Sequence, residues 1–293
     1  EGSPLSFTLS VLDIPGATVE TFHPKAVHLY GNTLYVANDA PGHYSLEVFD
    51  VSSGNVRHVK SMVEWMNGDK KETFAGEPNG VTRSYGKIYV TNTGSRTDVF
   101  DAETYEFITC IGTGTWGEGG YQTVHAFDVT ASQGAVFIRD KRKLVVVLEQ
   151  DVQPGSAARV PIYSRSVNLQ EAMGTYAVAA RNDGFLYVTA QNKNIIYLFD
   201  PADIRAGDTG FAPYLVTLGF EKSPQSIAFV GDRLFVTLRV DDKRSELWEI
   251  SPKNGKLLQD FTDSMVYPEK IAGARHTLLV VDRATQTVKA IGL

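Results

Sequence analysis

Short segments in which hydrophobic residues alternate with polar ones recur along the whole chain. The clearest copies share an apolar, aromatic and β-branched core, such as Leu-Tyr-Val-Ala-Asn and Ile-Tyr-Val-Thr-Asn. They begin at Leu34, Ile88, Val136, Leu186, Leu234 and Leu278, and successive starts lie 44 to 54 residues apart. A hydrophobic period of two indicates β-strands, whereas a helical repeat would show a period near 3.6.

Each copy is flanked by further β-like segments. One precedes it, often opening with proline as in Pro-Lys-Ala-Val-His-Leu-Tyr from Pro24, and one or two follow. Four short strands at this spacing are typical of a β-propeller blade. The chain is therefore predicted to be all-β: a six-bladed β-propeller with four-stranded antiparallel blades. The blades should start near residues 22, 76, 122, 173, 222 and 267, within one domain over residues 1–293.

The sixth copy ends after its third strand, at Leu293, while an unassigned β-like segment covers residues 5–14. An unpaired strand edge is a liability for a sheet. We therefore expect residues 5–14 to supply the outer strand of the last blade and to close the ring.

The second copy, residues 77–114, carries a recognisable order of short motifs: Pro-Asn-Gly-Val, a glycine turn, Tyr-Val-Thr-Asn, and then Val-Phe-Asp. In this order it resembles an NHL repeat, and Tyr-Val-Thr-Asn is similar to the YVTN-type repeats. The resemblance is clearest in the first, second and fourth copies. It implies a propeller, but NHL-like propellers include protein- and RNA-binding modules as well as extracellular enzymes.

Composition narrows the possible partners. The net charge is −6 and no basic block stands out, so nucleic acid is not expected. The sequence contains no run of about 18 apolar residues, so no transmembrane segment is predicted. The single cysteine, Cys110, lies in an apolar strand-like run and is interpreted as an inert core residue.

The first residues, Glu-Gly-Ser-Pro-Leu, do not begin with Met, which we interpret as the product of export-signal removal. The expected location is extracytoplasmic: secreted, periplasmic or anchored to the surface as a lipoprotein. The protein is expected to be a monomer.

Candidate binding residues follow from blade geometry. In an antiparallel blade the start of the first strand lies beside the end of the second, so both positions should face one mouth of the central channel. Polar residues follow the proline position in all six copies: Lys25, Asn79, His125, Tyr176, Gln225 and Glu269. Asn or Asp ends the second strand in four copies: Asn38, Asn92, Asp140 and Asp282. Structural alternatives remain open, because polar residues also line solvated pores and Asx side chains cap turns.

Two long connections each carry a tryptophan, residues 61–77 with Trp65 and residues 112–123 with Trp116. An aromatic ring above a polar mouth would suit a sugar or peptide, so Trp116 is also a candidate ligand-binding residue. The alternative is that each tryptophan packs its own loop. The Gly-Thr-Gly-Thr-Trp-Gly run from Gly112 is not followed by a helical pattern, which argues against a dinucleotide site.

The preferred function is a binding module whose mouth takes a small molecule, a saccharide or a protein or peptide partner. The alternative is a metal-dependent enzyme, because the blade number resembles that of gluconolactonase-like and paraoxonase-like lactonases and of peptide-amidating lyases. That resemblance implies calcium or zinc at the mouth, held by Asn79, Asn92, Asp140, Glu269 and Asp282, with His125 as a base. Lys25 beside these groups would oppose a cation. A third possibility, an RNA-binding scaffold, is disfavoured by the acidic net charge.

Overall fold

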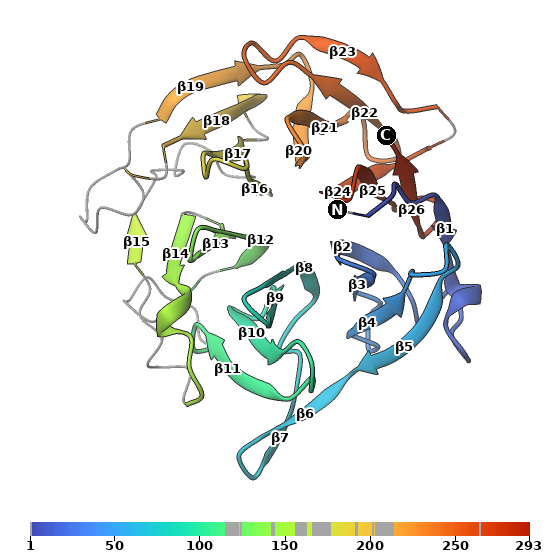
Figure 1. Ribbon diagram of the computed structural model, residues 1–293, viewed down its shortest axis with the longest axis vertical. Coiled ribbons are helices and arrows are strands. Elements are labelled where there is room, and N and C mark those ends of the chain that lie inside the picture. Colours follow the sequence, from blue (N-terminus) through green and yellow to red (C-terminus); the bar gives the residue numbers. More distant parts are fainter. Residues whose placement is uncertain are drawn as a thin grey trace.

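The computed structural model describes residues 2–114, 123, 125–141, 144–155, 163–165, 177–190, 193–200, 202, 214–263 and 265–293. It has six four-stranded antiparallel sheets arranged around a central channel (Figure 1). The predicted six-bladed β-propeller is confirmed.

In blades 1 to 5 the strands run from the channel outward in chain order. Blade 1 contains β2 (Pro24–Tyr30), β3 (Thr33–Asn38), β4 (Ser45–Asp50) and β5 (Arg57–Met62). Blade 2 contains β8 (Pro78–Ser84), β9 (Lys87–Asn92), β10 (Arg96–Asp101) and β11 (Phe107–Ile111). Blade 3 contains β12 (Ala126–Ser132), β13 (Ala135–Asp140), β14 (Leu144–Leu148) and β15 (Tyr163–Arg165), and a 3₁₀ turn, η2 (Glu149–Asp151), follows β14. Blade 4 contains β16 (Val178–Ala180), β17 (Leu186–Ala190), β18 (Ile195–Phe199) and β19 (Tyr214–Gly219). Blade 5 contains β20 (Ser223–Val230), β21 (Arg233–Arg239), β22 (Ser245–Ile250) and β23 (Leu257–Asp260).

Blade 6 joins the two ends of the chain. It contains β24 (Pro268–Ala274), β25 (Thr277–Asp282), β26 (Thr287–Gly292) and, as its outer strand, β1 (Phe7–Leu9). The predicted closure by the N-terminal segment is confirmed, but the paired stretch is shorter than residues 5–14. After Leu9 the chain turns into a 3₁₀ helix, η1 (Val11–Asp13), which Ser10 caps by accepting a hydrogen bond from Leu12 N.

The hydrophobic core lies between neighbouring blades. The described residues form six buried clusters, and each of them combines side chains of two adjacent sheets. In the cluster between blades 6 and 1, for example, Leu34 and Phe49 pack with Leu279 and Val281. The alternating apolar residues of the strands supply these contacts, and the ring therefore depends on every blade having two neighbours.

A two-stranded hairpin, β6 (Glu64–Asn67) and β7 (Lys70–Thr73), joins blades 1 and 2 and projects beyond the ring (Figure 1). The expected long loop over residues 61–77 is therefore partly regular. Trp65 is only 7% exposed, and its ring meets Phe74 at 4.8 Å and Phe100 at 4.9 Å. It packs its own segment onto blade 2, the second of the two alternatives drawn from the sequence.

A β-bulge recurs at the start of the innermost strand. In blades 1, 2, 3, 5 and 6 the pairing with the second strand shifts at the same point, as between Pro24 and Ala26 or between Pro78 and Gly80. Each shift leaves one extra residue on the inner strand, and bulges redirect such side chains. The extra residues are Lys25, Asn79, Phe127, Gln225 and Glu269.

Candidate functional site

The five bulge residues meet in one cavity of about 260 Å³ at the channel mouth, called here the mouth cavity. Its remaining lining residues come from the next position on β24 and from the loops and strand ends at the same face. These are Lys270, Asp39, Glu77, Thr93, Arg239 and Tyr267. Blades 1, 2, 3, 5 and 6 all contribute, as the expected geometry of a common mouth requires.

The floor of the mouth cavity is an ion pair that crosses the channel. Lys270 of blade 6 reaches the opposite blade 3, where its Nζ lies 3.1 Å from Asp128 Oδ1 and donates to Phe127 O at 2.8 Å. Asp128 Oδ2 also accepts from Val178 N at 3.0 Å. The same position is small in the other four blades: Ala26, Gly80, Ala177 and Ser226. These small residues leave room for Lys270 to span the channel.

This pair lies between the mouth cavity, which Lys270 lines, and a second cavity, which Asp128 lines. Burial lowers the pKa of Lys270 below its ordinary value, although Asp128 opposes the shift. The pair therefore divides the channel into two separate cavities.

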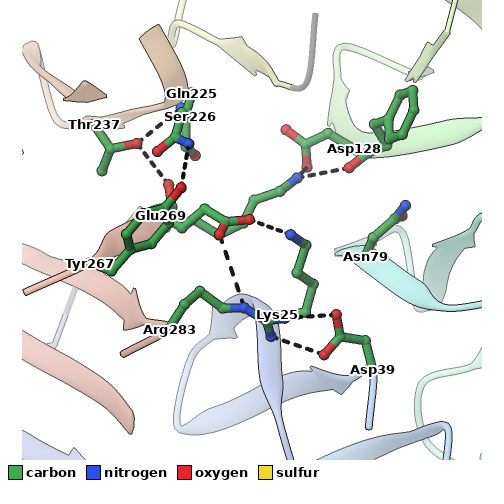
Figure 2. A network of polar contacts seen from close by, with 12 residues as sticks. Lys25, Asp39, Asn79, Asp128, Gln225, Ser226, Thr237, Tyr267, Glu269 and Arg283 are labelled. Carbon is green, nitrogen blue, oxygen red and sulfur yellow. Dashed lines mark hydrogen bonds and ion pairs between the residues drawn. The ribbon is translucent and has the colours of Figure 1, made fainter. Parts of the chain in front are cut away.

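The wall of the mouth cavity is a second set of ion pairs (Figure 2). Lys25 of blade 1 pairs with Glu269 of blade 6, and Arg283 donates two hydrogen bonds to Asp39, at 2.9 and 3.0 Å. Arg239 pairs with Asp242. Burial favours the neutral carboxyl of Glu269, but Lys25 and Arg283 outweigh it and hold the pKa of Glu269 below its usual value. Among the described residues, every lysine and arginine lining the mouth cavity has a carboxylate partner.

Gln225 carries a hydrogen-bond acceptor in this wall that has no partner among the described residues. Its Nε2 donates to the Tyr267 hydroxyl at 3.1 Å (Figure 2), but its Oε1 is buried and has no hydrogen-bond partner. The residue as a whole is 8% exposed. A buried acceptor without a donor costs about 1 to 3 kcal/mol, so this atom marks a place where a ligand donor group would be stabilised.

Asn79 is placed at the mouth as predicted, but its amide is already engaged. Its Nδ2 donates to Ala126 O at 2.6 Å, and its Oδ1 accepts from Thr91 Oγ1 at 2.8 Å. These bonds connect blade 2 to blade 3, which indicates a structural role. Its ligand-binding role stays a prediction.

The sequence alignment of blade 3 was displaced by two residues. Ala126 pairs with Asp140 as Pro24 pairs with Asn38, so Phe127, and not His125, holds the position of Lys25. Blade 3 has no proline to mark the start of its inner strand, and this is why the alignment failed. His125 instead precedes the bulge, with its backbone N–H bonded to Asp140 Oδ1 and its ring 6.2 Å from Phe127.

The Asn and Asp residues that end the second strands are buried caps. Asn38 Oδ1 accepts from His23 N at 2.8 Å and from Ala40 N at 3.1 Å. Asn92, Asp140 and Asp282 likewise accept backbone N–H groups. Their contacts support the turn-capping alternative rather than ligand binding.

In blades 1 and 2 the residue after the cap lines the mouth cavity instead, because side chains alternate along a strand. Asp39 and Thr93 occupy this position after Asn38 and Asn92, and Arg239 and Arg283 occupy it in blades 5 and 6. Sequence reasoning missed these residues. A shift of one position along the same alignment would have found them. Tyr176 and Trp116, the remaining candidates, lie outside the described residues.

The metal ligands implied by the lactonase resemblance do not converge on an ion site. Asn92, Asp140 and Asp282 cap backbone groups, and Lys25 and Arg283 accompany Glu269. Within the described part of the chain, no group of three His, Cys, Asp or Glu side chains could hold a metal ion. Cys110 is buried in the outer strand β11, and burial raises its pKa to about 12, as expected for an inert core thiol.

Comparison with known proteins reports on the fold alone. No family model matches the chain, and no curated protein does. Among solved structures, virginiamycin B lyase from Staphylococcus aureus is similar with a TM-score of 0.62, covering 98% of this chain and 99% of that one. The Cps50 (Swd1) β-propeller domain of Myceliophteria thermophila has a TM-score of 0.59, over 95% and 99% of the two chains.

The computationally designed Ika8 protein has a TM-score of 0.51, over 93% of this chain and 97% of that one. All three are 12% identical to this chain, and the likeness therefore carries no information on activity. Among the described residues, no helix is long and apolar enough to cross a membrane.

Proposed function

We propose that this protein is a binding module that holds a small polar molecule in the mouth cavity. The observation that carries the proposal is the buried, unpartnered Oε1 of Gln225 in a cavity that the inner strands of five blades build together. A rigid ring with a closed floor is the kind of preformed, concave site in which small ligands bind.

The charges of the wall favour a neutral ligand, and a saccharide fits them best. A free anion would have to displace Glu269 or Asp39 from its cation, whereas hydroxyl groups can bond to paired charged groups without separating them. Phe127 and Tyr267 add aromatic surface to the same cavity. A donor hydroxyl opposite Gln225 Oε1 would complete its hydrogen bonding.

We further propose that the chain is an NHL/YVTN-type propeller that works outside the cytoplasm. Two residues of the motifs that carry the resemblance have structural roles in blade 2. Pro78 begins its inner strand, and Asn92 caps the end of its second strand. The proposal also includes a protein or peptide that binds at the same mouth.

A metal-dependent lactonase or lyase is the alternative, and the side chains around Glu269 support it less well. Metal analysis of protein purified without chelator distinguishes the two functions. The binding proposal expects no stoichiometric calcium or zinc and a melting temperature that does not respond to chelator, whereas a bound ion would favour the enzyme.

The binding proposal is tested by thermal melting with neutral monosaccharides, an amino acid and a dicarboxylate as probes. A monosaccharide at about 100 times its Kd should raise the stability by about 2.7 kcal/mol, or the melting temperature by roughly 5 to 10 °C. Gln225→Ala should abolish the shift, and Gln259→Ala, at an exposed position of β23, should preserve it. A shift with the dicarboxylate alone, or one that survives Gln225→Ala, would contradict the proposal.

A further inference from the structure

The second cavity lies on the other side of the ion pair between Lys270 and Asp128. It measures about 190 Å³, and the inner strands of all six blades line it. Most of these residues are apolar or small, but His28 of blade 1 and Arg83 of blade 2 also face it. The two strands that carry them, β2 and β8, are neighbours in the ring.

Arg83 is held firmly but lacks a charged partner. Its Nη1 donates to the Tyr35 hydroxyl at 2.9 Å, and its guanidinium carbon lies 4.0 Å from the ring centre of Tyr30. Its Nε is buried without a hydrogen-bond partner, and the guanidinium forms no ion pair with any described residue. Stacking occupies the face of the guanidinium and Nη1 already bonds to Tyr35, so Nη2 and the second hydrogen of Nη1 are left to bond a planar or tetrahedral oxyanion.

The nearby carboxylates are engaged elsewhere. Asp128 pairs with Lys270 and accepts from Val178 N. Asp101 caps the turn after β10 by accepting from the backbone N–H groups of Glu103 and Thr104. This differs from the mouth cavity, where each described lysine and arginine has its own carboxylate.

His28 supplies a second group that an anion could bond. Its ring is half-buried and forms no hydrogen bond with a described residue, although it lines the cavity. Burial and the charge of Arg83 lower its pKa to about 4, so the ring is neutral near pH 7 and one of its nitrogen atoms is a donor.

From this geometry we infer that the second cavity is a binding site for a small oxyanion, either a carboxylate or a phosphate, with Arg83 as its charged anchor and His28 as a second donor. A charge-assisted, two-pronged bond from a held guanidinium is the usual basis of such recognition. The inference does not depend on the mouth cavity, because the two cavities lie on opposite sides of the Lys270–Asp128 pair.

Binding is measured near pH 7 by the chemical shifts of the His28 ring during titration with sodium phosphate or with sodium acetate. Sodium chloride holds the ionic strength constant. We expect saturable shifts with at least one of the two anions, and the anion that binds identifies the chemistry. Arg83→Gln should weaken binding by about tenfold or more. Arg83→Lys keeps the positive charge but cannot form two parallel hydrogen bonds to the anion, so it should weaken binding by less.

Arg181→Gln is the matched control. Arg181 also donates to a tyrosine hydroxyl, that of Tyr187 at 3.0 Å, but its charge is neutralised by Asp183. This variant should bind phosphate or acetate with the same affinity as the unmodified protein. Urea denaturation of each variant establishes that it is folded. Equal binding by folded Arg83→Gln, or no saturable shift with either anion, would overturn the inference.

Discussion

Asn38 and Asp39 are neighbours in the chain, yet their side chains have different roles. Asn38 is buried and bonds to backbone groups of its own blade, while Asp39 points to the mouth and binds Arg283 of blade 6. The alternation of side chains along a strand separates the two roles. At the residue scale, the fold and the site therefore use adjacent positions.

The crossing pair of Lys270 and Asp128 is expected to behave as a unit. Removing one partner leaves a buried charge alone, so Asp128→Asn and Lys270→Met should each lower the free energy of unfolding by about 3 kcal/mol. The double variant should lose clearly less than the sum of the two. Urea denaturation of the four proteins measures this coupling.

Arg57→Gln is the control for that cycle, because the pair of Arg57 with Asp50 is solvent-exposed and should contribute little to stability. Additive effects of the two buried substitutions, within about 0.5 kcal/mol, would show that the crossing pair does not exist in solution.

His28 should make stability depend on pH. Its folded pKa of about 4 lies below the unfolded value of 6.5, so between these pH values only the unfolded chain binds the proton. Stability should therefore fall by about 2 to 3 kcal/mol as the pH is lowered from 6.5 to 4. His28→Gln should remove this part of the slope in urea denaturation across that range, and His43→Gln, at an exposed position, should not. An unchanged slope in His28→Gln would contradict the prediction.

At the scale of elements, the strands were predictable and their irregularities were not. Alternation located the inner three strands of most blades, and proline marked where several inner strands start. A bulge adds one residue without disturbing the apolar pattern, and hence neither the bulges nor the blade 3 register could be derived. The β6–β7 hairpin did carry a signal, Gly68-Asp69, because a two-residue turn that begins with glycine is favoured between antiparallel strands.

Trp65 should anchor this hairpin to blade 2. Trp65→Ala removes its edge contacts with Phe74 and Phe100 and should cost about 3 to 5 kcal/mol of unfolding free energy. Met66→Ala is the matched control on the same strand, since Met66 is 54% exposed and should change stability by less than about 0.5 kcal/mol. Similar losses in both variants would mean that the hairpin is not packed as described.

At the scale of the whole molecule, the ring is held by the pairing of β1 with β26 and by contacts between blades 6 and 1. The closure could be predicted because the sixth copy has only three strands and the β-like segment at residues 5–14 has no other partner. The choice between a binding and a catalytic function could not be predicted, because it depends on which polar groups have no hydrogen-bond partner after folding. Gln225 Oε1 is such a group, and nothing in its sequence position distinguishes it from Asn79.

A chain that starts at Val11 should lose this closure. It lacks the buried Leu5 and Leu9 and exposes the edge of β26, so we expect a loss of at least about 4 kcal/mol and association through the free edge. Urea denaturation and light scattering measure the two effects. A chain that starts at Ser3 is the control and should remain close to the full chain. A stable, monomeric chain starting at Val11 would contradict the closure.

Ligand binding in the mouth cavity is tested by a crystal structure of the protein soaked with a mixture of neutral monosaccharides. We expect sugar density in the mouth cavity, with a hydroxyl group within hydrogen-bond distance of Gln225 Oε1 and the Lys25–Glu269 pair intact. Sugar bound elsewhere on the molecule, or a mouth cavity that contains only water, would contradict the assignment of this cavity as the binding site.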